Sequence, residues 1–174
     1  YQFPIVEYKD WGVGVIAAGL TVYAIASSTS ILTAGPLIDK YRARTFFPFY
    51  LIPFLLGVLV IWLGTASWTM YIYMALIGLS TGFGSATVAA LQVEFFGQKY
   101  IGTVRSLFTS MMVLSSAVGP ALYGILLDSG LSFDVVFAVT VFIWVLIILQ
   151  SFRSIPKYSR AKWKYKFRKR RGNV

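Results

Sequence analysis

The sequence predicts an all-α integral membrane protein with five transmembrane helices, and two observations support that prediction. Hydrophobic residues make up 57% of the 174 residues and charged residues only 13%, which leaves too little polar surface to cover a water-soluble globule. Long segments also lack charge altogether, since no Asp, Glu, Lys or Arg occurs in residues 11–38 or 45–93. A helix needs roughly 20 apolar residues to cross a bilayer, and each segment is long enough to do so.

Five spans are expected, over about residues 11–36, 46–64, 69–96, 104–127 and 135–152. The uncharged segment 45–93 is too long for one helix, so the Gly-Thr-Ala-Ser-Trp-Thr stretch at residues 64–69 is expected to divide it. Pro48 and Pro53 fall in the first turns of the second span, where a missing N–H costs least. Residues 1–152 are therefore predicted to form a helical bundle, and residues 153–174 a basic tail.

The distribution of charge predicts how the spans are oriented. Residues 1–152 contain six basic and six acidic side chains, whereas residues 153–171 contain ten basic side chains and no acidic one. Basic residues collect on the cytoplasmic side of membrane proteins. We therefore expect a multi-pass protein of the cell membrane with its N-terminus outside and its C-terminus in the cytoplasm. The basic residues expected on the cytoplasmic side before the tail are Lys40, Arg42, Arg44, Lys99 and Arg105, and only Lys9 lies on the opposite side.

Several function classes are not supported by the sequence. The chain has no cysteine and no histidine, and it shows no catalytic dyad, nucleotide-binding loop or metal-ligand cluster. We therefore expect neither an enzyme nor a cofactor-binding protein. The basic tail alternates with aromatic residues over 162–168, and because five spans precede it, its expected partner is the lipid bilayer and not nucleic acid. Since the chain starts at Tyr1 without a signal peptide, a fragment is the expected explanation.

A charged segment between the first two spans resembles a known signature. The pattern Gly35-x-x-x-Asp39-Lys40-x-x-x-Arg44 resembles the loop that the major facilitator superfamily repeats in each of its six-helix halves. Two further stretches are similar to helices 10 and 11 of bacterial members. They are Glu94-x-Phe96-Gly97-x-x-x-x-Gly102-x-x-Arg105 and Ser116-Ala117-x-Gly119-Pro120-x-x-x-Gly124-x-x-x-Asp128.

The resemblance implies that the five spans form most of a C-terminal six-helix bundle, from the end of helix 7 through helix 12. The charged segment departs from the fuller pattern, because Arg42 stands where a glycine is usual and Ala43 where a basic residue is usual. The aspartate equivalent to Asp39 helps to latch the two halves of such proteins. For Asp39 the partner would lie in an N-terminal half that this chain lacks. A role in fixing topology alone stays open.

The Gly35-Pro36 pair is expected to end the first span with a sharp exit. Glu94 is expected to form an ion pair with Lys99 or Arg105 at the cytoplasmic ends of the third and fourth spans, with a gating role as the alternative. In the third span, Gly78 and Gly82 predict a close contact with a neighbouring helix. Gly119-Pro120 predicts a kink in the fourth span.

The resemblance also implies a central cavity lined by the first, third and fourth spans. Candidate lining residues are polar and lie at mid-depth, although such hydroxyls more often bond within the helices. They are Tyr23, Ser27, Ser85 and Ser116. The function expected from all these features is secondary active transport of a small-molecule substrate by alternating access. A transport-inactive membrane scaffold or receptor with the same fold is the alternative.

Overall fold

The computed structural model describes residues 2–12, 14–130 and 132–154, and within them the chain folds into seven helices. The predicted basic tail lies outside the described residues, apart from Arg153 and Ser154. The helices follow one another in the order α1 (Gln2–Tyr8), α2 (Gly14–Tyr41), α3 (Ala43–Phe46), α4 (Leu51–Leu63), α5 (Thr69–Phe96), α6 (Ile101–Asp128) and α7 (Phe133–Ser154).

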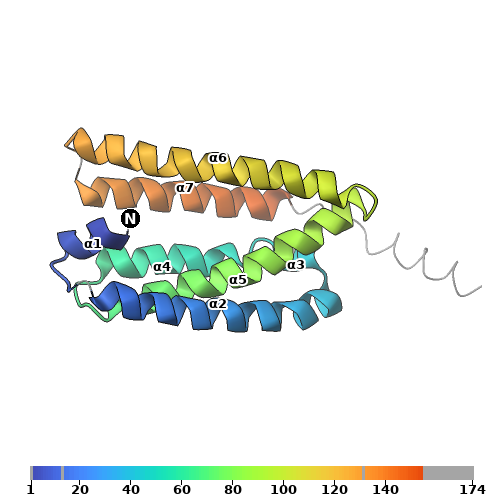
Figure 1. The fold of residues 1–174 in the computed structure, drawn as a ribbon, viewed down its shortest axis with the longest axis horizontal. Helices are drawn as coiled ribbons and strands as arrows, with labels where there is room; N and C mark the ends of the chain where they lie inside the picture. Colours follow the sequence, from blue (N-terminus) through green and yellow to red (C-terminus); the bar gives the residue numbers. More distant parts are fainter. Residues whose placement is uncertain (1, 13, 131, 155–174) are drawn as a thin grey trace, which may run out of the picture.

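Five helical segments are long and apolar enough to cross a membrane, which confirms the predicted fold class. They are Gly14–Tyr41, Ala43–Leu63, Thr69–Phe96, Ile101–Leu126 and Phe133–Arg153. Their axes run side by side, with α6 beside α7 and with α2, α4 and α5 gathered on the other side of the molecule (Figure 1). Successive long helices alternate in direction, so that one end of the bundle carries Lys9 and the other carries Arg44. These are called the Lys9 end and the Arg44 end below.

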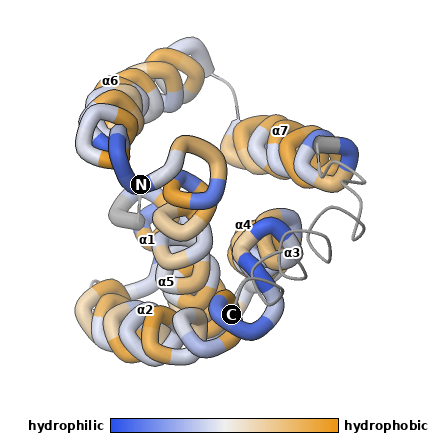
Figure 2. The backbone as a smooth tube through the Cα atoms, turned by 90° about the vertical axis from the view of Figure 1, so that its right-hand side faces the viewer, coloured by the Kyte–Doolittle hydropathy of each residue, from blue (hydrophilic) through white to orange (hydrophobic). Residues whose placement is uncertain are grey.

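The apolar side chains point outward to an extent that a water-soluble protein would not tolerate. No residue in the Ile101–Leu126 segment of α6 is buried, although that segment is rich in Leu, Met and Val. Met112 and Leu114, for example, are exposed by 73% and 68%. In Figure 2, hydrophobic residues mark parts of the tube of every long helix. Such surfaces require lipid or further protein as their surroundings.

The closest helix contact joins α2 and α5 through glycines. A Cβ on Gly82 would lie 2.4 Å from the Ser27 carbonyl oxygen, and one on Gly78 would lie 2.7 Å from the Tyr23 carbonyl oxygen. The Ser30 hydroxyl adds an interhelical hydrogen bond of 2.8 Å to the Leu79 carbonyl oxygen. The contact predicted from Gly78 and Gly82 is therefore confirmed, and α2 is the helix that approaches.

Two apolar clusters lie at opposite ends of the bundle. The cluster at the Lys9 end contains Ile5, Val6, Ile16, Val58, Ile61, Met70, Met74 and Phe137, and the cluster at the Arg44 end contains Ala34, Ile38, Ala43 and Leu91. Helix α1, which the sequence did not predict, contributes Ile5 and Val6 to the first cluster. At seven residues it is too short to show helical periodicity.

The expected end of the first span at Pro36 was wrong. Helix α2 continues through Gly35 and Pro36 to Tyr41, and the short helix α3 then precedes α4. Proline removes one backbone donor, but ending the helix there would leave several carbonyl groups without partners close to the apolar core, which costs more. The second span likewise begins in α3, and its regular helix α4 starts only at Leu51, after a turn that contains Pro48.

The glycine contact leads to a stability prediction. Gly82→Ala should destabilise the folded chain by roughly 1–3 kcal/mol, because the new methyl group overlaps the α2 backbone and forces the helices apart. Gly124→Ala is the matched control, since no atom lies within 4 Å of the position of its Cβ. Thermal unfolding of the purified chain in detergent measures both. Equal melting temperatures for the two variants would contradict the close α2–α5 contact.

Candidate functional site

The residues of the signature segment lie at the Arg44 end of the bundle, on two helices. Gly35, Asp39 and Lys40 belong to the last two turns of α2, and Arg44 belongs to α3. The side chains of Asp39 and Lys40 are exposed, and the Lys40 ammonium lies 5.2 Å from the centroid of the Tyr41 ring. Among the described residues, no hydrogen bond or ion pair involves the Asp39 carboxylate. Asp39 therefore presents its charge at the surface of this end.

Arg42 makes the break between α2 and α3. Its N–H donates a 2.8 Å hydrogen bond to the Ile38 carbonyl oxygen, which closes α2, and its backbone then takes φ 75° and ψ 144°. Residues with a Cβ rarely adopt this conformation, which suits glycine. The departure noted in the sequence, arginine in place of the usual glycine, thus falls at the one position of the segment that has glycine-like geometry.

Arg44 connects the segment to α5. Its Nε lies 3.0 Å from Glu94 Oε2, and its guanidinium carbon lies 4.3 Å from the centroid of the Phe95 ring. The ion pair of Glu94 is therefore made with Arg44, and not with Lys99 or Arg105 as expected. Lys99 instead lies 5.3 Å from the Tyr100 ring centroid. The sequence pointed to Lys99 and Arg105 because they are near Glu94 along the chain, whereas Arg44 is brought near by the fold.

The ion pair is accessible to solvent. The side chains of Arg44 and Glu94 are 34% and 31% exposed, so the attraction is partly screened. Exposed pairs of this kind contribute about 0.2–1 kcal/mol to stability. The pair is therefore a weak interaction between α3 and α5, and it can be broken and re-formed at a small cost in free energy.

The four candidate cavity-lining residues do not converge on one site. Tyr23 and Ser27 lie on the side of α2 that faces the glycines of α5, where their carbonyl oxygens are in close contact. Ser85 and Ser116 are exposed on different helices, and each donates a hydrogen bond to a carbonyl oxygen of its own helix. The central cavity that they were expected to line stays a prediction.

The predicted kink at Gly119 and Pro120 likewise stays a prediction, because α6 continues through both residues.

A polar cluster at the Lys9 end was missed by sequence reasoning. The Lys9 ammonium donates hydrogen bonds to the carbonyl oxygens of Trp62, at 3.4 Å, and of Gly64, at the end of α4. The Trp62 indole donates a 3.0 Å hydrogen bond to Asp134 Oδ1, in the first turn of α7. Burial lowers the pKa of Lys9, and the Asp134 carboxylate partly opposes this shift. A positive charge at a helix C-terminus and a negative charge at a helix N-terminus both interact favourably with the helix dipole.

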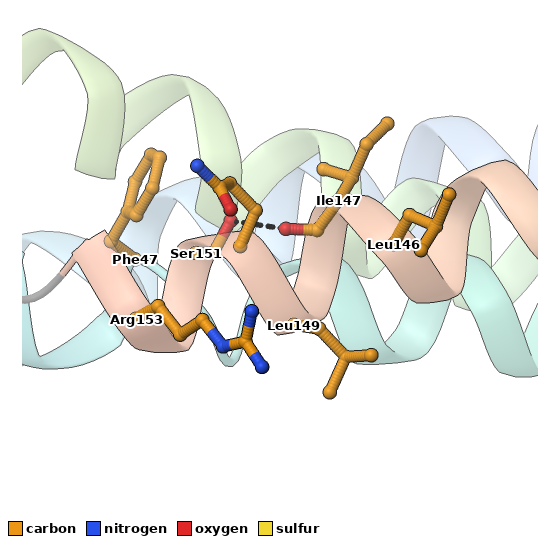
Figure 3. Close-up of a pocket in the computed structure, with 7 residues that line it drawn as sticks. Phe47, Leu146, Ile147, Leu149, Ser151 and Arg153 are labelled. Atoms are coloured by element: carbon orange, nitrogen blue, oxygen red, sulfur yellow. Dashed lines mark hydrogen bonds between the residues drawn. The ribbon is translucent and has the colours of Figure 1, made fainter.

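Two of the cavities that described residues line lie along α7. One, of about 670 Å³, follows the Arg44 end of α7, and its lining includes Phe47, Leu149 and Arg153. Figure 3 shows the ring of Phe47 on one side of α7 and Arg153 extending along the other, while the Ser151 hydroxyl bonds to the Ile147 carbonyl oxygen of its own helix. Its polar groups therefore do not converge. The other cavity, of about 240 Å³, lies toward the Lys9 end and is enclosed by several helices.

The helices and their apolar surfaces define a multi-pass membrane protein of the helical-bundle type. A family model described as "Major Facilitator Superfamily" matches residues 2–172, and the chain belongs to that superfamily. A curated relative, the "Bacillibactin exporter" of Bacillus subtilis (strain 168), is 25% identical over 145 residues, which cover 82% of this chain and 33% of the relative. The chain thus spans about a third of the length of that relative. No solved structure matches the chain.

The backbone of Arg42 gives a prediction for the signature segment. Arg42→Gly should stabilise the chain by about 1 kcal/mol relative to Arg42→Ala, because glycine adopts a φ of 75° without strain. Both variants remove the same charge, so the comparison isolates the backbone. Chemical unfolding of the two variants in the same detergent provides the measurement. If the alanine variant is as stable as the glycine variant, position 42 does not hold the positive φ.

Proposed function

We propose that this chain is the C-terminal half of a secondary active transporter that moves a small solute across the cell membrane by alternating access. The observation on which the proposal chiefly rests is its membership of the major facilitator superfamily over nearly the whole sequence, together with the signature segment at one end of the bundle. Membership supports a membrane transporter in general and points away from an enzyme. The half, the mechanism and the solute are the proposed parts.

The missing N-terminal half is the proposed partner of the exposed signature residues. Asp39 stands at the end of α2 with its carboxylate directed to no described residue, and Lys40 is exposed beside it. An uncompensated carboxylate can accept hydrogen bonds from the N-terminus of a helix and interacts favourably with its dipole. We assign Asp39 to a latch between the halves, made in one state of the transport cycle and broken in another.

We propose that the Arg44–Glu94 ion pair stabilises the Arg44 end within this half. Because it joins α3 to α5, it keeps the segment that follows Asp39 attached to the bundle while the two halves move. Its exposure keeps the interaction weak enough to rearrange. Lys99 and Arg105, with the basic residues after α7, would then supply the positive charges that face the cytoplasm and its anionic lipids.

The direction proposed for transport is export. The relative with a curated name is an exporter, and bacillibactin, the molecule in that name, is the first solute to try. Other small solutes follow in the same assay. None of the four candidate lining residues is charged, so these residues supply no clamp for a charged solute.

Transport by the full-length protein in proteoliposomes tests the proposal. A gradient-dependent flux of solute is expected, and Asp39→Asn should reduce it about tenfold, since an amide loses the charge-assisted bonds of the latch. Asp10→Asn, which removes the same charge at the Lys9 end, is the matched control and should retain the flux. If no solute is moved by a gradient and Asp39→Asn changes nothing, the protein is a membrane scaffold or receptor with a transporter fold.

A further inference from the structure

The cavity of about 240 Å³ toward the Lys9 end is lined by none of the signature residues and by none of the four polar candidates. Its walls come from five helices, α1, α4, α5, α6 and α7, so that residues far apart in the sequence surround one space. The lining residues are Ile5, Phe54, Val58, Ile61, Tyr73, Tyr123, Phe133, Val136, Phe137, Thr140 and Trp144. Convergence of this kind distinguishes it from the cavity along the Arg44 end of α7.

Aromatic rings dominate the walls of this cavity. The rings of Phe54 and Trp144 are stacked with their centroids 4.2 Å apart and their planes 29° from parallel. Phe133 lines the same space and stacks on Tyr8 of α1, at 4.5 Å between centroids. None of the described lining residues is charged, so a charged ligand would lose its hydration without compensation. The walls therefore favour a neutral molecule with an aromatic face.

Three hydroxyl groups converge on the cavity, and two of them satisfy each other. The Thr140 hydroxyl donates to the Val136 carbonyl oxygen at 2.8 Å, which leaves its oxygen to accept from the Tyr123 hydroxyl. The Tyr73 hydroxyl has no hydrogen-bond partner among the described residues. It is thus the group in this cavity that is available to a ligand, as a donor or as an acceptor.

We propose that this cavity binds a small neutral aromatic molecule that carries one polar substituent. The ring packs against the stacked pair of Phe54 and Trp144, and the substituent bonds to the Tyr73 hydroxyl. A cavity of about 150 Å³ holds one benzene ring, so a space of this size accommodates about two fused rings. Apolar walls with a few convergent polar groups are the usual composition of a ligand site. This site does not depend on the proposed transport function.

Binding of 1-naphthol to the 174-residue chain in lipid nanodiscs tests the site. Saturable binding is expected, above the non-saturable partitioning of 1-naphthol into lipid. Val136→Phe fills the cavity and should weaken saturable binding at least about tenfold. Val135→Phe is the matched control, because the Val135 side chain is 43% exposed and does not line the cavity. That variant should bind within about twofold of the unmodified chain.

The polar contact has its own test, which also covers the case in which Val136→Phe fails to fold. Tyr73→Phe should weaken 1-naphthol binding by about three- to tenfold, the effect of one hydrogen bond, without changing the affinity for naphthalene. The melting temperature of this variant should be that of the unmodified chain. The proposal is overturned by absence of saturable binding, by equal binding to the two valine variants when both fold, or by an equal loss of naphthalene and 1-naphthol in Tyr73→Phe.

Discussion

The close approach of α2 to α5 is the contact on which the rest of the structure depends. Lipid is as apolar as the side chains, so burial of apolar surface alone does not hold helices together in a bilayer, and close packing with interhelical hydrogen bonds must do so. Gly78 and Gly82 have no side chain that would keep the two backbones apart, and the Ser30 hydroxyl donates a hydrogen bond from α2 to the Leu79 carbonyl oxygen of α5. This contact fixes the position of α2 and therefore that of the signature residues at its end.

The two ends of the bundle are held by different chemistry. At the Arg44 end, the polar contact between α3 and α5 is one exposed ion pair, which lies beside the apolar cluster of Ala34, Ile38, Ala43 and Leu91. At the Lys9 end, an ammonium group binds the last carbonyl oxygens of α4, an indole bonds to Asp134, and aromatic rings of α1 and α7 stack. Several partly desolvated contacts of this kind outweigh a single screened pair. The polar contact at the Arg44 end is therefore the one that can rearrange at lower cost, and this end also carries the signature segment.

The sequence was sufficient to predict the fold class, the five spans and a close helix contact at Gly78 and Gly82, because each depends on local composition and on the spacing of small residues. It did not predict that α2 is the helix that makes this contact. It failed where neighbours along the chain and neighbours in space differ. Glu94 was matched with Lys99 and Arg105, whereas the fold brings Arg44 to it. Pro36 was taken as a helix end, although the demand for paired carbonyl groups carries α2 to Tyr41. The cavity near Tyr73 draws on five helices, and no local pattern could have predicted it.

The most direct test of the central claim, a membrane-spanning half-transporter with its signature segment in the cytoplasm, is the sidedness of single cysteines. The chain has no cysteine of its own, so each introduced thiol gives an unambiguous signal. Thr65→Cys lies in the exposed link at the Lys9 end, and Gln98→Cys lies in the exposed link at the Arg44 end. A membrane-impermeant maleimide should label the first in intact cells and the second only after permeabilisation. Labelling of both from the same side would contradict the account.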